Sequence, residues 1–473
     1  MGSVNEKIFR AYDIRGIYPG ELDEEMARQI GRAFAVYLRE TEAEEPEKII
    51  VGHDVRLSSP ILSSSFIQGI TLEGIDVLDI GEVTVDMVYF ASSYFHWPAA
   101  MVTASHNPKE YNGFKLMKKN TELIGNDSGL RDIRMITEKN WPEHTEDFGA
   151  YAQTNRGKTV AQSIFEEYRR HVLSFIDVEA IGPIKVAIDT GSGAAGPILK
   201  MILEKLPIDY KPLNFEPDGN FISHEPDPTK EKNLEELKTE IKTGHHYNFG
   251  CAFDGDGDRI VFVDENGNLV SSSIIGAIMA RHFLKAYPRG KIVYGSAVSR
   301  IIPEAVNIYG GEAIRERIGH TFISKRLKEV DGVFGMETSS HYYFRKNFYA
   351  DSGIISFLVM LYILSCTNKR LSGLAAEFSK YVSIPEINFS TKGGSASGGK
   401  VFDTEEFLKK IAQNFEGYDM DWFDGLTVRT EDFWLNIRSS NTEPLVRLNI
   451  EAKDELILER TKKDIVTLIG RYK

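Results

Sequence analysis

Three short apolar segments share one pattern, and this repeated pattern limits the fold more than any other feature of the sequence. "KIIVGHD" starts at Lys48, "KVAIDTG" at Lys185 and "KIVYGS" at Lys291. In each, a lysine leads into an apolar run and then a glycine or aspartate, and a helix-like segment follows. Apolar strands that alternate with helices are typical of parallel sheets covered by helices. We therefore expect three α/β domains of one plan, at intervals too long for a solenoid, whose period would be roughly 20–50 residues.

The C-terminal part of the chain has a different pattern. Apolar and polar residues alternate on both sides of a polar turn in "DFWLNIRSSNTEPLVRLNIEA", residues 432–452, which predicts two antiparallel strands. A segment with helical spacing follows, so we expect an α+β domain here. A chain of 473 residues has room for three or four domains at about 100–200 residues each. We predict the domains at residues 1–154, 155–268, 269–383 and 384–473.

The composition argues against several classes of function. The net charge is −13, from 56 basic and 69 acidic residues, which disfavours a nucleic acid or an anionic membrane surface as the main partner. A small anionic substrate stays compatible, because it needs only a few local arginines. The two cysteines, Cys251 and Cys366, cannot form a disulfide framework, so we expect buried thiols in a cytoplasmic protein. The longest apolar run, residues 353–366, is shorter than the roughly 20 residues of a membrane span and predicts a buried helix.

An acidic, glycine-rich loop is the first candidate site. In "CAFDGDGDRIVFVDENG", Asp254, Asp256 and Asp258 alternate with glycines after an apolar segment. Hard oxygen ligands at this spacing, with glycines that free the backbone, can converge on one small cation such as Mg²⁺. An EF-hand calcium loop fits less well, because Arg259 stands where that loop needs glycine and a strand-like segment follows. A plain acidic surface turn stays open, although Arg259 suits a phosphate that also contacts the metal.

A serine in a turn is the second candidate. Ser105 lies in "MVTASHNPKEYNGFK", between an apolar run and His-Asn-Pro, and Lys115 follows a second turn. A serine hydroxyl is a poor nucleophile unless it is activated or carries a group in advance. No G-x-S-x-G elbow is present, and a hydrolase triad would need a remote base and acid. The alternative is that Ser105 carries a phosphoryl group, that the three aspartates hold a metal which neutralises it, and that Lys115 acts in proton transfer.

Two further loops contain side chains suited to a sugar phosphate. "RSSNTEPLVR", residues 438–447, gathers arginines, hydroxyls and an amide in one turn, which suits a phosphate dianion but also a well-capped polar hairpin turn. In "GMETSSHYYF", Glu337 and Ser339 point the same way if the chain is extended, and His341 follows on that side. A carboxylate and a hydroxyl suit sugar hydroxyls, although a Glu-x-Ser-x-His pattern also arises by chance.

Taken in order, these motifs point to a family. "TASHNP", "DGDGDR", the E-x-S-x-H loop and "RSSNTEP", preceded by "FRAYDIRG", occur at domain-sized spacing. The chain resembles the α-D-phosphohexomutase superfamily over nearly its whole length, and within it the phosphomannomutase and phosphoglucomutase branch. The resemblance implies three α/β domains with mixed sheets and a C-terminal α+β domain, arranged around a central active-site cleft. It also implies an isomerase that interconverts hexose 1-phosphate and hexose 6-phosphate.

The resemblance implies a role for each motif. Ser105 would be the phosphoserine and, through its phosphate, a metal contact, while the three aspartates would hold one Mg²⁺. The reaction would pass through a hexose 1,6-bisphosphate, which also serves as activator. Proton transfer and charge stabilisation would fall to Lys115, Arg15 and His341. The remaining substrate contacts would come from Tyr12, His106, Asn107, Arg259, Gly319, His320, Glu337, Ser339, Arg438, Ser440, Asn441, Thr442 and Arg447.

Details of two loops bear on the choice of sugar. Some family members have a lysine in a "D-V-K-x-S-R" stretch where this chain has Ala297 in "YGSAVSR", which puts one substrate contact in question. Thr338 stands where the glucosamine branch usually has glutamine. We expect mannose phosphate as substrate with glucose phosphate accepted, because a loop that reads the 3- and 4-hydroxyls separates these two sugars poorly. Phosphoglucosamine mutase or phosphoglucomutase specificity is the alternative.

Two other classes of function compete with a mutase. A metal-dependent sugar-phosphate phosphatase would account for "FDGDGD", which is similar to the aspartyl-nucleophile motif D-x-D-G. That motif ends in Thr or Val where this chain has Asp258, and it leaves the serine loop unexplained. A silent sugar-phosphate sensor would keep the fold, but every catalytic residue is present. As partners we expect small hexose phosphates, no nucleic acid and no membrane, and a monomer or a homodimer.

Overall fold

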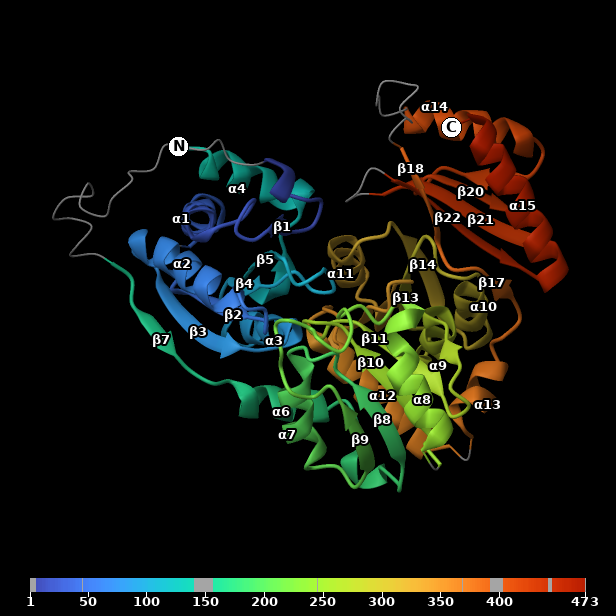
Figure 1. Ribbon diagram of the computed structural model, residues 1–473, viewed down its shortest axis with the longest axis horizontal. Coiled ribbons are helices and arrows are strands. Elements are labelled where there is room, and N and C mark those ends of the chain that lie inside the picture. The colour runs from blue at the N-terminus through green and yellow to red at the C-terminus, as the bar shows by residue number, and fades with distance from the viewer. Residues whose placement is uncertain are drawn as a thin grey trace.

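The computed structural model describes residues 6–44, 46–139, 156–244, 246–367, 369–391, 403–440 and 445–472. They form four sheets that follow one another along the chain, each with helices packed on it (Figure 1). The first sheet has the order β1-β5-β4-β2-β3-β7, with β6 beside β5. Its strands are β1 (Ile14–Ile17), β2 (Lys48–His53), β3 (Asp76–Glu82), β4 (Ala99–Val102), β5 (Tyr111–Lys118), β6 (Glu122–Leu123) and β7 (Thr159–Ala161).

The first sheet is mixed and covered on both faces. β2 pairs in parallel with β3 and β4, whereas β5 is antiparallel to β4 and β1. Successive residues of β2 point to opposite faces, so Ile49 and Ile50 belong to separate hydrophobic clusters. The helices are α1 (Glu24–Thr41), α2 (Ser59–Leu72) and α4 (Leu130–Thr137) on the Ile49 side, and α3 (Val85–Phe95) on the Ile50 side.

The second and third sheets are also mixed. Their orders are β12-β11-β10-β8-β9 and β14-β13-β15-β16. The second comprises β8 (Lys185–Asp189), β9 (Asp209–Leu213), β10 (Phe249–Phe253), β11 (Ile260–Asp264) and β12 (Leu269–Val270), with α6 (Phe165–Leu173), α7 (Ala195–Leu203) and α8 (Glu235–Thr243). The third comprises β13 (Lys291–Gly295), β14 (Glu312–Glu316), β15 (Phe334–Met336) and β16 (Tyr342–Phe344), with α9 (Ser272–Ala286), α10 (Ile301–Ile308), α11 (His320–Glu329), α12 (Gly353–Ser365) and α13 (Leu371–Ala376).

The three lysine-led segments are equivalent strands, as predicted. β2, β8 and β13 begin at Lys48, Lys185 and Lys291, and each has a parallel neighbour on both sides. Strands of this kind are buried on both faces and are therefore continuously apolar rather than alternating. The expectation of related α/β domains with mixed sheets is confirmed.

The fourth sheet is antiparallel throughout its described pairings, with the order β17-β22-β21-β20-β19 and β18 beside β22. The predicted pair of strands in residues 432–452 is confirmed as β21 and β22. This sheet has its own hydrophobic cluster and lies beside the third, near β14 and α10 (Figure 1). Its elements are β17 (Val382–Ser383), β18 (Ile387–Ser390), β19 (Asp419–Asp421), β20 (Leu426–Arg429), β21 (Phe433–Ser439), β22 (Leu445–Ala452), α14 (Thr404–Ala412) and α15 (Glu455–Tyr472).

Three details of the fold bear on the sequence predictions. β7 pairs with β3, so the first sheet extends beyond the predicted boundary at residue 154; the other boundaries stay predictions. The apolar run at residues 353–366 forms the buried helix α12, and no helix among the described residues is long and apolar enough to cross a membrane. Cys251 is buried as expected, but Cys366 is exposed, because it follows the last turn of α12.

Candidate active site

The serine loop follows β4, at the carboxyl end of a parallel strand where α/β sheets bind ligands. Ser105 is 1% exposed and has a positive φ of 50°. Its backbone N–H donates to Thr103 Oγ1 at 2.8 Å. Its hydroxyl donates to Asp254 Oδ2 at 2.8 Å and lies 3.1 Å from His106 Nδ1. The structure therefore joins the serine loop and the aspartate loop, which are far apart in sequence.

A buried arginine holds the serine loop, and the sequence analysis missed it. Arg56 is fully buried behind the end of β2 and is paired with Asp54 at 3.1 Å. Its Nη1 donates to the carbonyls of Pro108 and Tyr111 at 2.7 and 3.0 Å, and its Nη2 donates to those of Ser105 and Asn107 at 2.7 Å each. The signal that could have revealed it is "GHDVR", an Asp-x-Arg directly after an apolar strand.

The three aspartates lie in the turn between β10 and β11. They are 0–2% exposed, and one carboxylate oxygen from each lies within 4.8 Å of the others. Gly255 allows the two loops to meet, because a Cβ there would lie 2.7 Å from the Ser105 carbonyl oxygen. Among the described residues, the Oδ1 atoms of Asp256 and Asp258 are buried without a hydrogen-bond partner, although His341 Nε2 lies 3.3 Å from Asp258 Oδ1. Carboxylate oxygens gathered this closely are what Mg²⁺ requires as ligands, so these residues fit the predicted metal.

The charges in this cluster depend on one lysine. Lys115 Nζ, on β5, donates to Asp256 Oδ2 at 2.8 Å and to Asp258 Oδ2 at 2.6 Å. Burial alone would lower the pKa of Lys115, but the two carboxylates outweigh it and hold that pKa well above its usual value. Burial, together with Asp258 and Asp256, raises the pKa of Asp254 well above its usual value. The single ammonium group thus contacts two of the three buried carboxylates and offsets one negative charge of the cluster.

The aspartate cluster gives the first testable prediction. Replacing Asp256 with asparagine removes one negative ligand and leaves an amide opposite Lys115. Loss of even an outer partner of a metal ligand costs about 10–100-fold in affinity, so we expect Mg²⁺ or Mn²⁺ binding, measured by calorimetry, to weaken by at least this factor. Asp127→Asn, at a side chain that is 65% exposed, is the matched control. Equal metal affinity in the two variants would show that these aspartates do not form the site.

The loop that contains Glu337, Ser339 and His341 follows β15 and reaches the aspartate cluster. Glu337 is buried and accepts hydrogen bonds from the Gly319 N–H at 2.8 Å and from Tyr343 Oη at 2.6 Å. Ser339 Oγ lies 2.8 Å from His341 Nδ1, and His341 Nε2 lies 3.3 Å from Asp258 Oδ1. Burial opposes ionisation of Glu337, but its partners lower its pKa to about 2.

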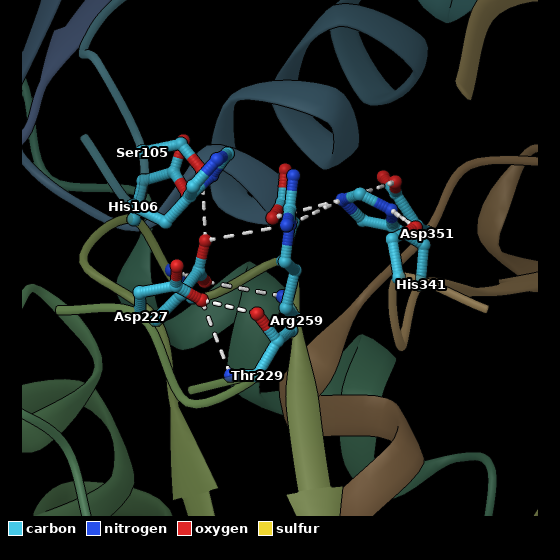
Figure 2. Close-up of polar contacts among 12 residues, drawn as sticks. Ser105, His106, Asp227, Thr229, Arg259, His341 and Asp351 are labelled. Carbon is cyan, nitrogen blue, oxygen red and sulfur yellow. Dashed lines mark hydrogen bonds and ion pairs between the residues drawn. The ribbon is translucent and has the colours of Figure 1, made fainter. Parts of the chain in front are cut away.

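Arg259 lies at the centre of the site. Figure 2 shows its side chain between Ser105 and His106 on one side and His341 and Asp351 on the other. Its Nε lies 3.2 Å from His341 Nε2 and 3.9 Å from Asp254 Oδ2. Burial lowers its pKa, but Asp254, Asp258 and Asp227 raise it on balance. Two further acidic side chains, Asp227 and Asp351, were not predicted from the sequence. Asp351 is 1% exposed, lies 4.0 Å from His341 Nε2, and has no hydrogen-bond partner for either carboxylate oxygen among the described residues.

A loop of the third sheet closes on the first sheet at Tyr12. Tyr12 Oη donates to the Ile318 carbonyl at 2.8 Å, and its ring lies 5.5 Å from that of His320. Gly319 has a φ of 139°, and a Cβ there would lie 2.5 Å from the Tyr12 ring. Arg15, close by on β1, donates to the Ala104 carbonyl at 3.1 Å and to Asn107. Tyr12 thus contacts the substrate loop predicted at Gly319 and His320, and Arg15 contacts the serine loop.

His320 gives a prediction that does not depend on activity. Burial and the Lys115 ammonium lower the pKa of its imidazole to about 4, so it should stay neutral where an ordinary histidine, with a pKa of about 6.5, becomes charged. In ¹⁵N-imidazole NMR, the signal lost in His320→Gln should complete only a small part of its titration between pH 7 and pH 5. Titration of that signal near pH 6.5 would contradict the described packing.

The predicted phosphate loop is only partly described. Asn441 and Thr442 lie outside the described residues. Arg438 and Arg447 sit opposite each other on β21 and β22, and Glu386 lies 3.4 Å from Arg438 Nη2 and 3.1 Å from Arg447 Nη1. Ser440 donates its backbone N–H to the Leu445 carbonyl at 2.8 Å. The described contacts of the two arginines thus include the shared carboxylate of Glu386 and, for Arg438, the Ser439 carbonyl at 3.4 Å.

Comparison with known proteins agrees with this arrangement. Four family models match: phosphoglucomutase/phosphomannomutase alpha/beta/alpha domains I, II and III at residues 6–142, 166–267 and 271–381, and the C-terminal domain at 400–468. The chain belongs to the phosphoglucomutase/phosphomannomutase family, as its motifs predicted. It is therefore an enzyme of the phosphohexomutase type.

Individual relatives cover almost the whole chain. A phosphomannomutase of Methanocaldococcus jannaschii is 37% identical over 98% of both chains, and one of Escherichia coli is 33% identical over 98% of both. A solved structure of a phosphoglucomutase/phosphomannomutase family protein from Burkholderia thailandensis superposes with a TM-score of 0.86, at 28% identity, over 99% of this chain and 98% of that one. The relatives support activity on hexose phosphates but do not fix the sugar.

Proposed function

We propose that this enzyme interconverts mannose 1-phosphate and mannose 6-phosphate, accepts the glucose phosphates, and works through a phosphoserine at Ser105. The observation that carries the proposal is the contact between Ser105 Oγ and Asp254 Oδ2 at 2.8 Å. It places a hydroxyl from a strained turn directly against a carboxylate cluster fitted for a divalent cation. A hydroxyl in that position is suited to hold a phosphoryl group between transfers.

In the proposed reaction, the phosphoryl group of Ser105 passes to the free hydroxyl of a hexose phosphate. The bond between Ser105 Oγ and phosphorus breaks as the bond from the sugar oxygen forms, which yields a hexose 1,6-bisphosphate. The sugar then turns over, and its other phosphoryl group returns to Ser105. The three aspartates would hold a Mg²⁺ ion, which would supply positive charge for the transferring phosphoryl group. The bisphosphate also restores enzyme whose serine has lost its phosphate.

The side chains around Ser105 orient it and offset charge. Lys115 brings an ammonium group to the edge of the carboxylate cluster, and Arg259 brings a guanidinium to its other side. Positioned charges of this kind carry most of the catalysis in phosphoryl transfer. Arg15 contacts the serine loop directly, and His341 lies between Asp258 and Ser339. We assign proton transfer and charge stabilisation to Lys115, Arg15 and His341.

The remaining groups are proposed to read the substrate. Glu337 and Ser339 face the 3- and 4-hydroxyls, and the fourth sheet grips the phosphate that does not react, whichever end of the sugar carries it. A loop of guanidinium, hydroxyl and amide groups can accept both orientations, because it recognises charge rather than ring geometry. The other contacts are assigned to Tyr12, His106, Asn107, Gly319, His320, Arg438, Ser440, Asn441, Thr442 and Arg447.

Comparison of substrates tests the proposal. With Mg²⁺ and a trace of glucose 1,6-bisphosphate, ³¹P NMR should show α-mannose 1-phosphate converting to mannose 6-phosphate. One small group on a substrate commonly changes kcat/KM by about 10–200-fold. We therefore expect kcat/KM for glucose 1-phosphate to differ from that for mannose 1-phosphate by no more than the upper end of this range. If only glucosamine 1-phosphate were converted, the enzyme would have the specificity of a phosphoglucosamine mutase. Release of inorganic phosphate from every substrate would show phosphatase activity and contradict the proposed mutase reaction.

A further inference from the structure

A cavity between the third and fourth sheets lies apart from the residues assigned to catalysis. Its volume is about 190 Å³, compared with roughly 30 Å³ for each water molecule in the liquid, so it has room for a small molecule. Among the described residues that line it, three are arginines and none is acidic. The lining is Tyr294, Ser296, Val298, Arg300, Pro303, Arg315, Arg429, Thr430 and Trp434.

The three arginines come from both sides of the junction. Arg315, on β14, lies 2.6 Å from Asp421 Oδ1, and Arg429, on β20, contacts the other oxygen of the same carboxylate. Arg300 donates to the Thr430 carbonyl at 3.2 Å and lies 3.3 Å from Glu451. The three guanidiniums thus contact three carboxylates: Asp421, Glu451 and Asp419, whose Oδ2 lies 3.6 Å from Arg429 Nη1. Nη2 of Arg300 is buried with no hydrogen-bond partner among the described residues.

We propose that this cavity is a second anion site, which takes a small phosphate-bearing dianion. Guanidiniums present paired N–H donors that match phosphate oxygens, and several converging on one cavity favour a dianion over a single charge. Ser296 and Tyr294 add hydroxyl groups to the same lining. Either inorganic phosphate or a phosphorylated sugar has the required chemistry.

Occupation of this site would weaken the contacts that hold the third and fourth sheets together. Asp421 joins the third-sheet Arg315 to the fourth-sheet Arg429, so a dianion that takes these guanidiniums competes with the carboxylate that holds them together. Nearby, Asp424 accepts from Ser296 and, at 3.1 Å, from the Ile318 N–H, next to Gly319. The anion would therefore loosen the fourth sheet beside the proposed substrate loop and lower kcat.

A binding experiment tests the site without relying on activity. Phosphate is titrated by calorimetry, at fixed ionic strength, into Arg438→Met, in which the proposed active-site clamp is weakened. We expect about one phosphate per chain, unaffected by adding Arg326→Met, a control at a third-sheet side chain that is 41% exposed and outside the cavity. Adding Arg315→Met should weaken binding at least tenfold, about the value of one charge-assisted hydrogen bond. Adding Arg429→Met instead should weaken phosphate binding to the same extent. Because Arg429 lies on the fourth sheet and Arg315 on the third, the same loss in both variants would not be explained by a local folding defect in one sheet.

Two further arms complete the test. Repeating the titration with glucose 6-phosphate distinguishes the sources: tighter binding than phosphate assigns the site to a phosphorylated sugar, and equal binding assigns it to phosphate itself. In steady-state kinetics, phosphate should lower kcat as well as raise KM in the wild type and in Arg326→Met, but only raise KM in Arg315→Met. Absence of phosphate binding to Arg438→Met, or binding unchanged by both Arg315→Met and Arg429→Met, overturns the proposal. Because the titration needs no turnover, its failure is distinct from a failure of the proposed function.

Discussion

Replacing Ser105 with alanine is expected to reduce mutase turnover by at least about 10⁴-fold, because loss of a covalent nucleophile removes the route rather than slowing it. The hydroxyl is 1% exposed and contacts Asp254, and no other described serine makes a hydrogen bond to the three aspartates. The fold should survive, since the loop is held through its backbone by Arg56. The measurement is conversion of mannose 1-phosphate in a coupled assay.

The control for this prediction is a serine on a helix that packs on the same sheet. Ser64→Ala changes an exposed hydroxyl on α2 and should leave turnover unchanged. The far-ultraviolet circular dichroism spectrum of Ser105→Ala should match that of the wild type, which would show that the fold is retained. Turnover within tenfold of the wild type in Ser105→Ala would mean that the phosphoryl group is carried elsewhere.

Replacing Arg56 with methionine is expected to give the largest loss of stability. The guanidinium is fully buried, and its removal takes one charged donor from Asp54 and one donor from each of four loop carbonyls. Removing one partner of a buried ion pair typically costs about 3–5 kcal/mol, so the urea midpoint of the first domain should fall markedly. Turnover should fall with it, because the serine loop loses its anchor.

Two variants separate the role of Arg56 from a general effect of losing an arginine. Arg56→Lys keeps the charge but cannot reach four carbonyls, so it should recover part of the stability and little of the turnover. Arg131→Met, at a side chain that is 66% exposed on α4, should change stability by less than about 0.5 kcal/mol. If Arg56→Met unfolds at the same urea concentration as Arg131→Met, the loop is not held as described.

The sequence predicted the parallel strands well because burial on both faces leaves a continuous apolar run. It missed β7, since a strand of three exposed residues at a sheet edge has no such pattern. Cys366 was expected to be buried from the habit of its residue type, but its position after α12 exposes it. Edges and ends of elements are set by tertiary packing, which local pattern does not record.

The site was predictable where its chemistry lies in compact motifs. Ser105, the aspartates and the Glu337–His341 loop each contain enough reactive groups in a few residues to be recognised. Arg56 and Asp351 were missed because neither lies in a motif with several reactive groups, and only the folded chain brings Arg56 to the serine loop. The link from Ser105 to Asp254 spans two sheets, and the residues alone suggested it only as a hypothesis, in which a metal held by the aspartates neutralises a phosphoryl group on Ser105.

Transfer of labelled phosphate tests the central claim most directly. The protein is mixed with one equivalent of ³²P-labelled glucose 1,6-bisphosphate and Mg²⁺, digested, and its peptides are mapped by mass spectrometry. The account predicts label on the peptide that contains Ser105, and complete release of that label into mannose phosphates when unlabelled mannose 1-phosphate is added. Label on another residue, or label found only as free inorganic phosphate, would contradict it.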